Sequence, residues 1–176
     1  MHHYTYTWGR ESDDEFTYFP YSLEVTVKLP AEEMWKEWEQ CFVDVDKCWL
    51  WPKEFSRPKF ETLPPRKGGK FVLDYEMPNF KKPSAEKTDI TYDYELEEWD
   101  PEKMSCKYVG VGRHVFRGGG QMTIKPIDEN SCTFRWEGRY TYKPEEGSKS
   151  LEYQFPRYFN TFLIKAAENI QEKTGY

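Results

Sequence analysis

Most of the middle of this chain alternates between apolar and polar residues, which is the pattern of β-strands with one buried face. Segment 70–77 shows it most clearly, because Phe71, Leu73, Tyr75 and Met77 fall on one face. The same alternation predicts further strands at 21–29, 59–63, 88–99, 103–109, 113–127 and 132–142. Continuous apolar runs are absent, so the pattern favours an antiparallel sheet with one wet face over a doubly wound parallel sheet.

Other stretches have helical spacing instead. Residues 31–42 follow Pro30, begin with glutamates and place apolar side chains on one face, which predicts a helix. A second short helix is expected at 45–51, ending before Pro52. The longest such stretch runs over 151–174, and its apolar face is predicted to consist of Phe155, Phe159, Phe162, Leu163, Ala166, Ala167 and Ile170.

Together these elements predict an α+β fold. A curved antiparallel sheet of about six to seven strands would wrap around the long C-terminal helix, with two short helices after the first strand. At 176 residues the chain is most simply one domain over 21–176, preceded by an N-terminal arm over 1–20. The alternation of Tyr4, Tyr6 and Trp8 in this arm fits an extra strand, an ordered arm or a frayed terminus.

Aromatic residues make up 18% of the chain, which is the most unusual number in its composition. Aromatic rings favour strands and can simply build a wide sheet. They also line ligand pockets, so both interpretations stay open. Lys plus Arg total 25 against 31 Asp plus Glu, a net charge of −6, and no basic stripe is present, so nucleic acid is not expected as a partner.

The four cysteines, Cys41, Cys48, Cys106 and Cys132, show no CxxC pair and follow no secretory segment. This pattern predicts reduced thiols in a cytoplasmic protein. No apolar run approaches 18 residues, so no transmembrane segment is expected.

One histidine, His114, lies outside the N-terminus and is expected on the apolar face of the strand at 113–127. It could act as a catalytic acid or base together with Tyr108, or it could be a hydrogen-bonded core histidine. The glycines at 118–120 predict a bulge or bend in the same strand. Tyrosine hydroxyls in the space between sheet and helix could bind a ligand or point to water at the rim. The residues predicted to face this space and bind a ligand are Phe71, Tyr75, Tyr92, Tyr94, Phe116, Met122, Trp136, Tyr140, Tyr158, Phe159 and Phe162.

Other chemistries find little support in the sequence. The histidine and the scattered cysteines offer no metal-ligand spacing, so no metal is expected. Residues 110–112 are a GxG fragment without the third glycine of a dinucleotide fingerprint, and no other cofactor is expected.

Several local segments resemble the START-like helix-grip (SRPBCC) superfamily, which includes the birch-pollen allergen-like proteins and the polyketide cyclase/dehydrase and lipid transport group. Residues 23–35 look like its first strand running into a helix through Pro30-Ala31. Residues 45–52 look like its second helix, and the Gly68-Gly69-Lys70-Phe71 turn and the terminal helix fit as well. The resemblance implies a curved sheet that grips the long helix around an apolar cavity, while the aromatic arm departs from the family.

Three functions follow from this reading. The leading one is binding of a small hydrophobic or aromatic ligand, lipid or polyketide-like, in an internal cavity. The second is a metal-independent cyclase or dehydratase, in which His114 moves a proton and a tyrosine hydroxyl stabilises an enolate. The third is an interaction module, whose aromatic arm adds a strand to a partner or forms a homodimer.

Overall fold

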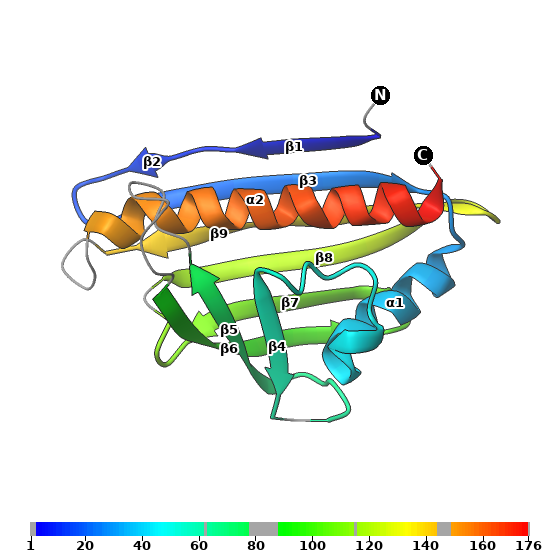
Figure 1. Cartoon of the computed structure of the whole chain (residues 1–176), viewed down its shortest axis with the longest axis horizontal. Coiled ribbons are helices and arrows are strands. Elements are labelled where there is room, and N and C mark those ends of the chain that lie inside the picture. The colour runs from blue at the N-terminus through cyan, green and yellow to red at the C-terminus, as the bar shows by residue number, and fades with distance from the viewer. Residues whose placement is uncertain (1–2, 62, 78–87, 115, 144–148, 176) are drawn as a thin grey trace.

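The computed structural model describes residues 3–61, 63–77, 88–114, 116–143 and 149–175, without the side chains of 75–77, 88–90 and 149–153. One antiparallel sheet and one long helix dominate it (Figure 1). The strands are β1 (Tyr4–Trp8), β2 (Glu11–Ser12), β3 (Thr17–Val27), β4 (Ser56–Phe60), β5 (Lys70–Met77), β6 (Thr88–Asp100), β7 (Ser105–Val111), β8 (Arg117–Asp128) and β9 (Ser131–Tyr142). The helices are α1 (Ala31–Val43), the 3-10 turn η1 (Val45–Lys47) and α2 (Lys149–Thr174).

The strands form a single sheet in the order β1-β3-β9-β8-β7-β6-β5-β4, with β2 also paired to β3. Each predicted strand segment corresponds to one observed strand, and β5 has the predicted bounds. Within the described residues the sheet has nine strands rather than six or seven, because the arm contributes β1 and β2. Tyr4 pairs with Val25 and Trp8 with Tyr21, so the arm is an extra strand and not a frayed end.

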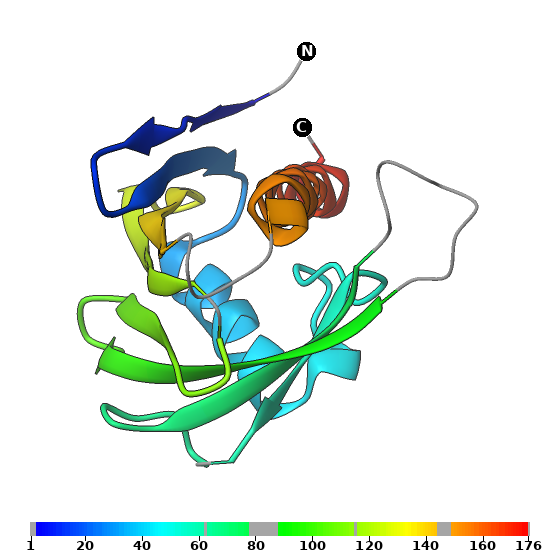
Figure 2. The ribbon, with the colours of Figure 1, turned by 90° about the vertical axis from the view of Figure 1, so that its left-hand side faces the viewer.

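The long helix α2 lies along the concave side of the sheet (Figures 1 and 2). Figure 2 looks along the helix and shows β3 and β9 on one side of it and the curled β5–β6 half of the sheet below. The whole predicted apolar face of α2 is buried: Phe155, Phe159, Phe162, Leu163, Ala166, Ala167 and Ile170. The helix-grip fold predicted from the sequence is therefore present.

The cysteine prediction is wrong for one pair. The sulfur atoms of Cys41, in α1, and Cys48 are joined in a disulfide, whereas Cys106 and Cys132 are free and buried. The two bonded cysteines are seven residues apart, a separation that matches no CxxC motif. They meet because the chain turns back on the end of α1 through η1, which is shorter than the predicted helix over 45–51.

The connection between β7 and β8 also differs from expectation. Residue 113 was predicted to begin a strand, but β8 begins at Arg117. Gly112 adopts a φ of +51°, a conformation that favours glycine, and the Asp93 carboxylate accepts hydrogen bonds from the Arg113 backbone N–H at 2.7 Å and from its guanidinium. These contacts hold a turn in place, so His114 lies on a loop rather than on a strand face.

The β8–β9 pairing runs in register from Arg117 to Pro126, so it has no bulge at 118–120. Gly118 has a φ of +77°, outside the range of a regular strand, which fits the bend that was predicted as the alternative. Other glycines allow close approach of the backbone. A Cβ on Gly119 would lie 2.1 Å from the Tyr108 carbonyl oxygen, and one on Gly138 would lie 2.1 Å from the Gly119 carbonyl oxygen. Because both contacts are with backbone, neither neighbour can move away cheaply.

Gly119→Ala is therefore expected to lower the free energy of unfolding by at least about 2 kcal/mol, since the added methyl group must force β7 and β8 apart. Gly9→Ala is the matched control, because a Cβ there would meet only the Pro20 side chain at 3.7 Å. Urea unfolding of the full chain measures both. Equal stability of the two variants would contradict the close-approach account.

Candidate functional site

A small void lies between the concave face of the sheet and α2. It leaves about 10 Å³ for the centre of a water molecule, which is room for roughly one water. Its walls come from α1, the segment before β4, strands β5, β6, β7 and β9, and α2. Ten of its eleven lining side chains are aromatic: Trp38, Phe42, Trp51, Phe71, Tyr94, Tyr108, Trp136, Tyr140, Phe159 and Phe162, with Leu73 as the eleventh.

The rings around the void pack on one another. Phe71 stacks on Tyr94 with ring centroids 5.1 Å apart, and Phe162 meets Trp51 edge to face at 5.1 Å. Phe159 contacts Tyr140 edge to face at 5.0 Å. Because these contacts nearly fill the space, a ligand larger than a water molecule can enter only if some rings move.

Buried hydroxyl groups give this aromatic interior a polar centre. The Trp136 indole N–H donates to the Tyr108 hydroxyl at 2.7 Å, and the Tyr21 hydroxyl donates to the Gly119 carbonyl oxygen at 2.9 Å. Since the one Tyr21 hydrogen is used there, Tyr108 is the donor in the 3.3 Å contact between the two hydroxyls. Burial raises the pKa of Tyr108 to about 12 and that of Tyr21 well above its usual range, so both remain protonated at neutral pH.

His114 is also buried, next to this hydroxyl group cluster. Its Nδ1 accepts the Phe116 backbone N–H at 3.0 Å, so the ring hydrogen is on Nε2, which donates to the Tyr94 hydroxyl at 2.9 Å. The ring stacks on Tyr92 with centroids 4.0 Å apart. Burial, and then the Arg117 guanidinium, lower the pKa of His114 to about 3, so the imidazole is neutral.

Two arginines hold the His114 loop from outside. Arg113 binds Asp93 through two guanidinium contacts, at 2.9 and 2.7 Å, and these hydrogen bonds lower the Asp93 pKa to about 2. Arg117 donates to the carbonyl oxygens of His114 and Phe116. Both arginines are exposed. The loop thus inserts a neutral histidine whose acceptor nitrogen is already used, a geometry typical of a core histidine.

The structure gathers about half of the predicted site residues around the void: Phe71, Tyr94, Tyr108, Trp136, Tyr140, Phe159 and Phe162. His114, Tyr92, Phe116, Met122 and Tyr158 are buried but do not line it. Tyr158 instead donates its hydroxyl hydrogen to the Phe55 carbonyl oxygen. The side chain of Tyr75 lies outside the described residues.

Sequence reasoning missed four lining residues: Trp38, Phe42, Trp51 and Leu73. Trp38 and Phe42 are apolar residues of the helix predicted over 31–42, and Leu73 shares a strand face with Phe71. The pattern of apolar residues therefore already indicated that all three are buried. Trp51 carried no such signal, because it lies in a segment that was expected to be helical.

Within the described part of the chain, no helix is both long and apolar enough to cross a membrane. The same residues hold no cluster of three or more histidine, cysteine, aspartate or glutamate side chains arranged for a metal ion.

The fold and the aromatic interior agree with a comparison against known protein families, in which residues 19–172 match the family described as polyketide cyclase / dehydrase and lipid transport. The chain belongs to this family. The match covers the sheet from within β3 and nearly all of α2. A search of curated protein sequences found no match.

Solved structures share the helix-grip architecture at low sequence identity. Norcoclaurine synthase from Thalictrum flavum superposes with a TM-score of 0.60 at 15% identity, covering 94% of each chain. Ginseng major latex-like protein 151 from Panax ginseng gives a TM-score of 0.61 at 12% identity, covering 90% of this chain and 99% of its own. A protein from Thermobifida fusca gives 0.53 at 20% identity, covering 86% and 92%. These likenesses show that the chain shares its fold with these proteins.

The buried neutral state of His114 predicts a pH dependence. Its pKa is about 3 in the folded protein, against 6.5 for an exposed histidine, so the unfolded chain binds the extra proton first as the pH falls. Stability is therefore fully present above about pH 6.5 and decreases below it, by about 2 kcal/mol between pH 7 and pH 5.

Urea unfolding of the wild-type chain and of His114→Gln, which cannot titrate, measures this contribution as the difference between the two pH profiles. The imidazole NMR signal of His114 should also stay unchanged from pH 8 to pH 5. A His114 signal that titrates near pH 6.5 would refute the assignment.

Proposed function

We propose that this protein binds a small hydrophobic or aromatic ligand, such as a lipid or a polyketide-like compound, between the sheet and α2. The observation that carries the proposal is the void at this place, lined by ten aromatic rings and Leu73. Apolar walls with a few polar groups are the usual composition of small-molecule sites. The family and the fold fit hydrophobic ligand binding.

The small size of the void defines how binding would occur. A ligand can enter only if some of the aromatic rings move. The bound form is therefore a second arrangement of the same interior side chains. A flat aromatic molecule suits this exchange, because it can replace ring–ring contacts with similar ones. A solved norcoclaurine synthase structure contains dopamine and hydroxybenzaldehyde, which are single-ring aromatic molecules, in the same fold at 14% identity.

Catalysis of the cyclase or dehydratase type is the second candidate, and one observation favours it. Tyr108 is a protonated residue lining the void, and its hydroxyl could stabilise an oxyanion if its hydrogen turned away from the 3.3 Å contact with Tyr21. His114 is poorly placed to take a proton in this arrangement, because its Nδ1 already accepts the Phe116 N–H. In an enzyme of this kind, the tyrosine hydroxyls would carry the catalytic role.

The interaction module has weaker support. The arm is paired along β3, and the Tyr6 hydroxyl donates to the Asn160 side chain on α2, so most of the arm serves the fold. Trp8, at the end of β1, is 54% exposed.

The test of the binding proposal uses 2-naphthol as a two-ring phenolic probe and follows tryptophan fluorescence. We expect saturable one-to-one binding to the full chain. Leu73→Ala, which enlarges the void, should bind the probe about tenfold more tightly, because fewer rings must move.

Leu96→Ala is the matched control, since Leu96 is fully buried in β6 but does not line the void. Both substitutions are expected to cost about 2–5 kcal/mol of stability. Equal probe affinity of the two variants, or no saturable binding to any of the three proteins, would contradict the proposal. Native mass spectrometry of freshly purified protein would identify the class of a natural ligand.

A further inference from the structure

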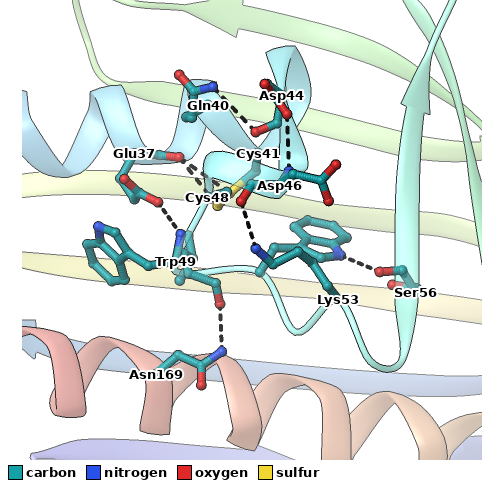
Figure 3. Close-up of a disulfide and its surroundings, with 12 residues drawn as sticks. Glu37, Gln40, Cys41, Asp44, Asp46, Cys48, Trp49, Lys53, Ser56 and Asn169 are labelled. Carbon is teal, nitrogen blue, oxygen red and sulfur yellow. Dashed lines mark hydrogen bonds between the residues drawn. A yellow bond between two sulfur atoms is a disulfide. The ribbon is translucent and has the colours of Figure 1, made fainter.

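A segment that we call the strap, Cys48–Ser56, runs from η1 to β4 between α1 and α2 (Figure 3). Two hydrogen bonds attach it to α2. The Asn169 side chain donates to the Leu50 carbonyl oxygen at 3.2 Å, and the Tyr158 hydroxyl donates to the Phe55 carbonyl oxygen. The strap therefore closes the gap between the helix and the β4 edge of the sheet.

The strap is also attached to α1, at its beginning. Cys48 is bonded to Cys41, and the Glu37 carboxylate accepts the Trp49 backbone N–H at 2.6 Å (Figure 3). Cys41 and Cys48 are both buried. Among these attachments the disulfide is the covalent one, and the others are hydrogen bonds.

Trp51 is the residue through which the strap reaches the void. It is 4% exposed, and its ring lies 5.1 Å from that of Phe162 and 6.0 Å from that of Trp136. Its indole N–H donates to the Ser56 carbonyl oxygen at 3.1 Å, so the ring is fixed to the other end of the strap. Movement of the strap would thus carry an indole ring out of the aromatic interior.

From this connection we infer that the Cys41–Cys48 disulfide is a redox-controlled latch on the ligand space: oxidised, it holds Trp51 in the void, and reduced, it frees the strap to move outward. The inference rests on the proposed function for its purpose but concerns a separate set of contacts. The reductant is a dithiol. Its two sulfur atoms form a disulfide, and the two electrons and two protons convert the Cys41–Cys48 bond into two thiols.

Release of Trp51 would leave an opening of useful size. An indole ring is a two-ring aromatic system, so the space it vacates, added to the existing void, suits a flat ligand of similar size. Apolar cavities of about 150 Å³ are known to bind benzene. On this inference, the ligand takes the place that Trp51 has in the oxidised protein.

The test compares the full chain oxidised with glutathione disulfide and reduced with dithiothreitol. Alkylation and mass measurement should count two free thiols in the first and four in the second. On reduction, hydrogen exchange of the Trp49 amide should become at least tenfold faster, while the Phe134 amide in β9 keeps its rate. Binding of 2-naphthol should become at least tenfold tighter.

Two variants separate the latch from general destabilisation. The double variant Cys41→Ser, Cys48→Ser should behave like the reduced protein under both conditions. Cys132→Ser, which removes a buried free thiol and keeps the disulfide, should respond to dithiothreitol as the wild type does.

Four thiols after oxidation, an unchanged Trp49 exchange rate on reduction, or an equal rise at Phe134 would each overturn the latch. Probe binding reports on the proposed function separately. Equal binding in both redox states with unchanged strap exchange overturns the latch and supports the function. A strap that opens on reduction without any probe binding supports the latch and overturns the function.

Discussion

Burial of one face of α2 against the concave side of the sheet is the constraint on which the rest of the structure depends. The sheet curves around the helix, and close contacts leave no room for a side chain at Gly119 and Gly138. The arm, the strap and α1 then close the remaining sides. The aromatic character of the interior follows, because large rings are needed to span the distance between helix and sheet.

A wide aromatic interior contains hydroxyl and indole groups that need partners. Here they partner one another and the backbone, through Trp136, Tyr108 and Tyr21 on one side and His114 with Tyr94 on the other. This arrangement fixes the orientation of each ring. Among the described residues that line the void, none is charged.

Much of the fold could be predicted from the sequence, because alternation and helical spacing report directly on burial. The bounds of β5 and the buried face of α2 are examples. The turn before His114 could not be predicted, since it depends on a contact between Asp93 in β6 and Arg113 in the turn itself. The disulfide and the position of Trp51 could not be predicted for the same reason. Each depends on where a loop crosses a helix, and periodicity carries no information about loops.

The pairing of β3 with β9 joins residues far apart in the chain, for example Thr17 with Tyr142. The first long strand therefore has no neighbour toward the sheet centre until nearly the whole polypeptide exists. Local hairpins from β5 to β9 can form early, but the N-terminal strands and α2 must then close a very long loop, which is the slow kind of step in folding. Until that closure, the aromatic face of the hairpins is open to water, and this is the stage at which a newly made chain is most exposed to aggregation.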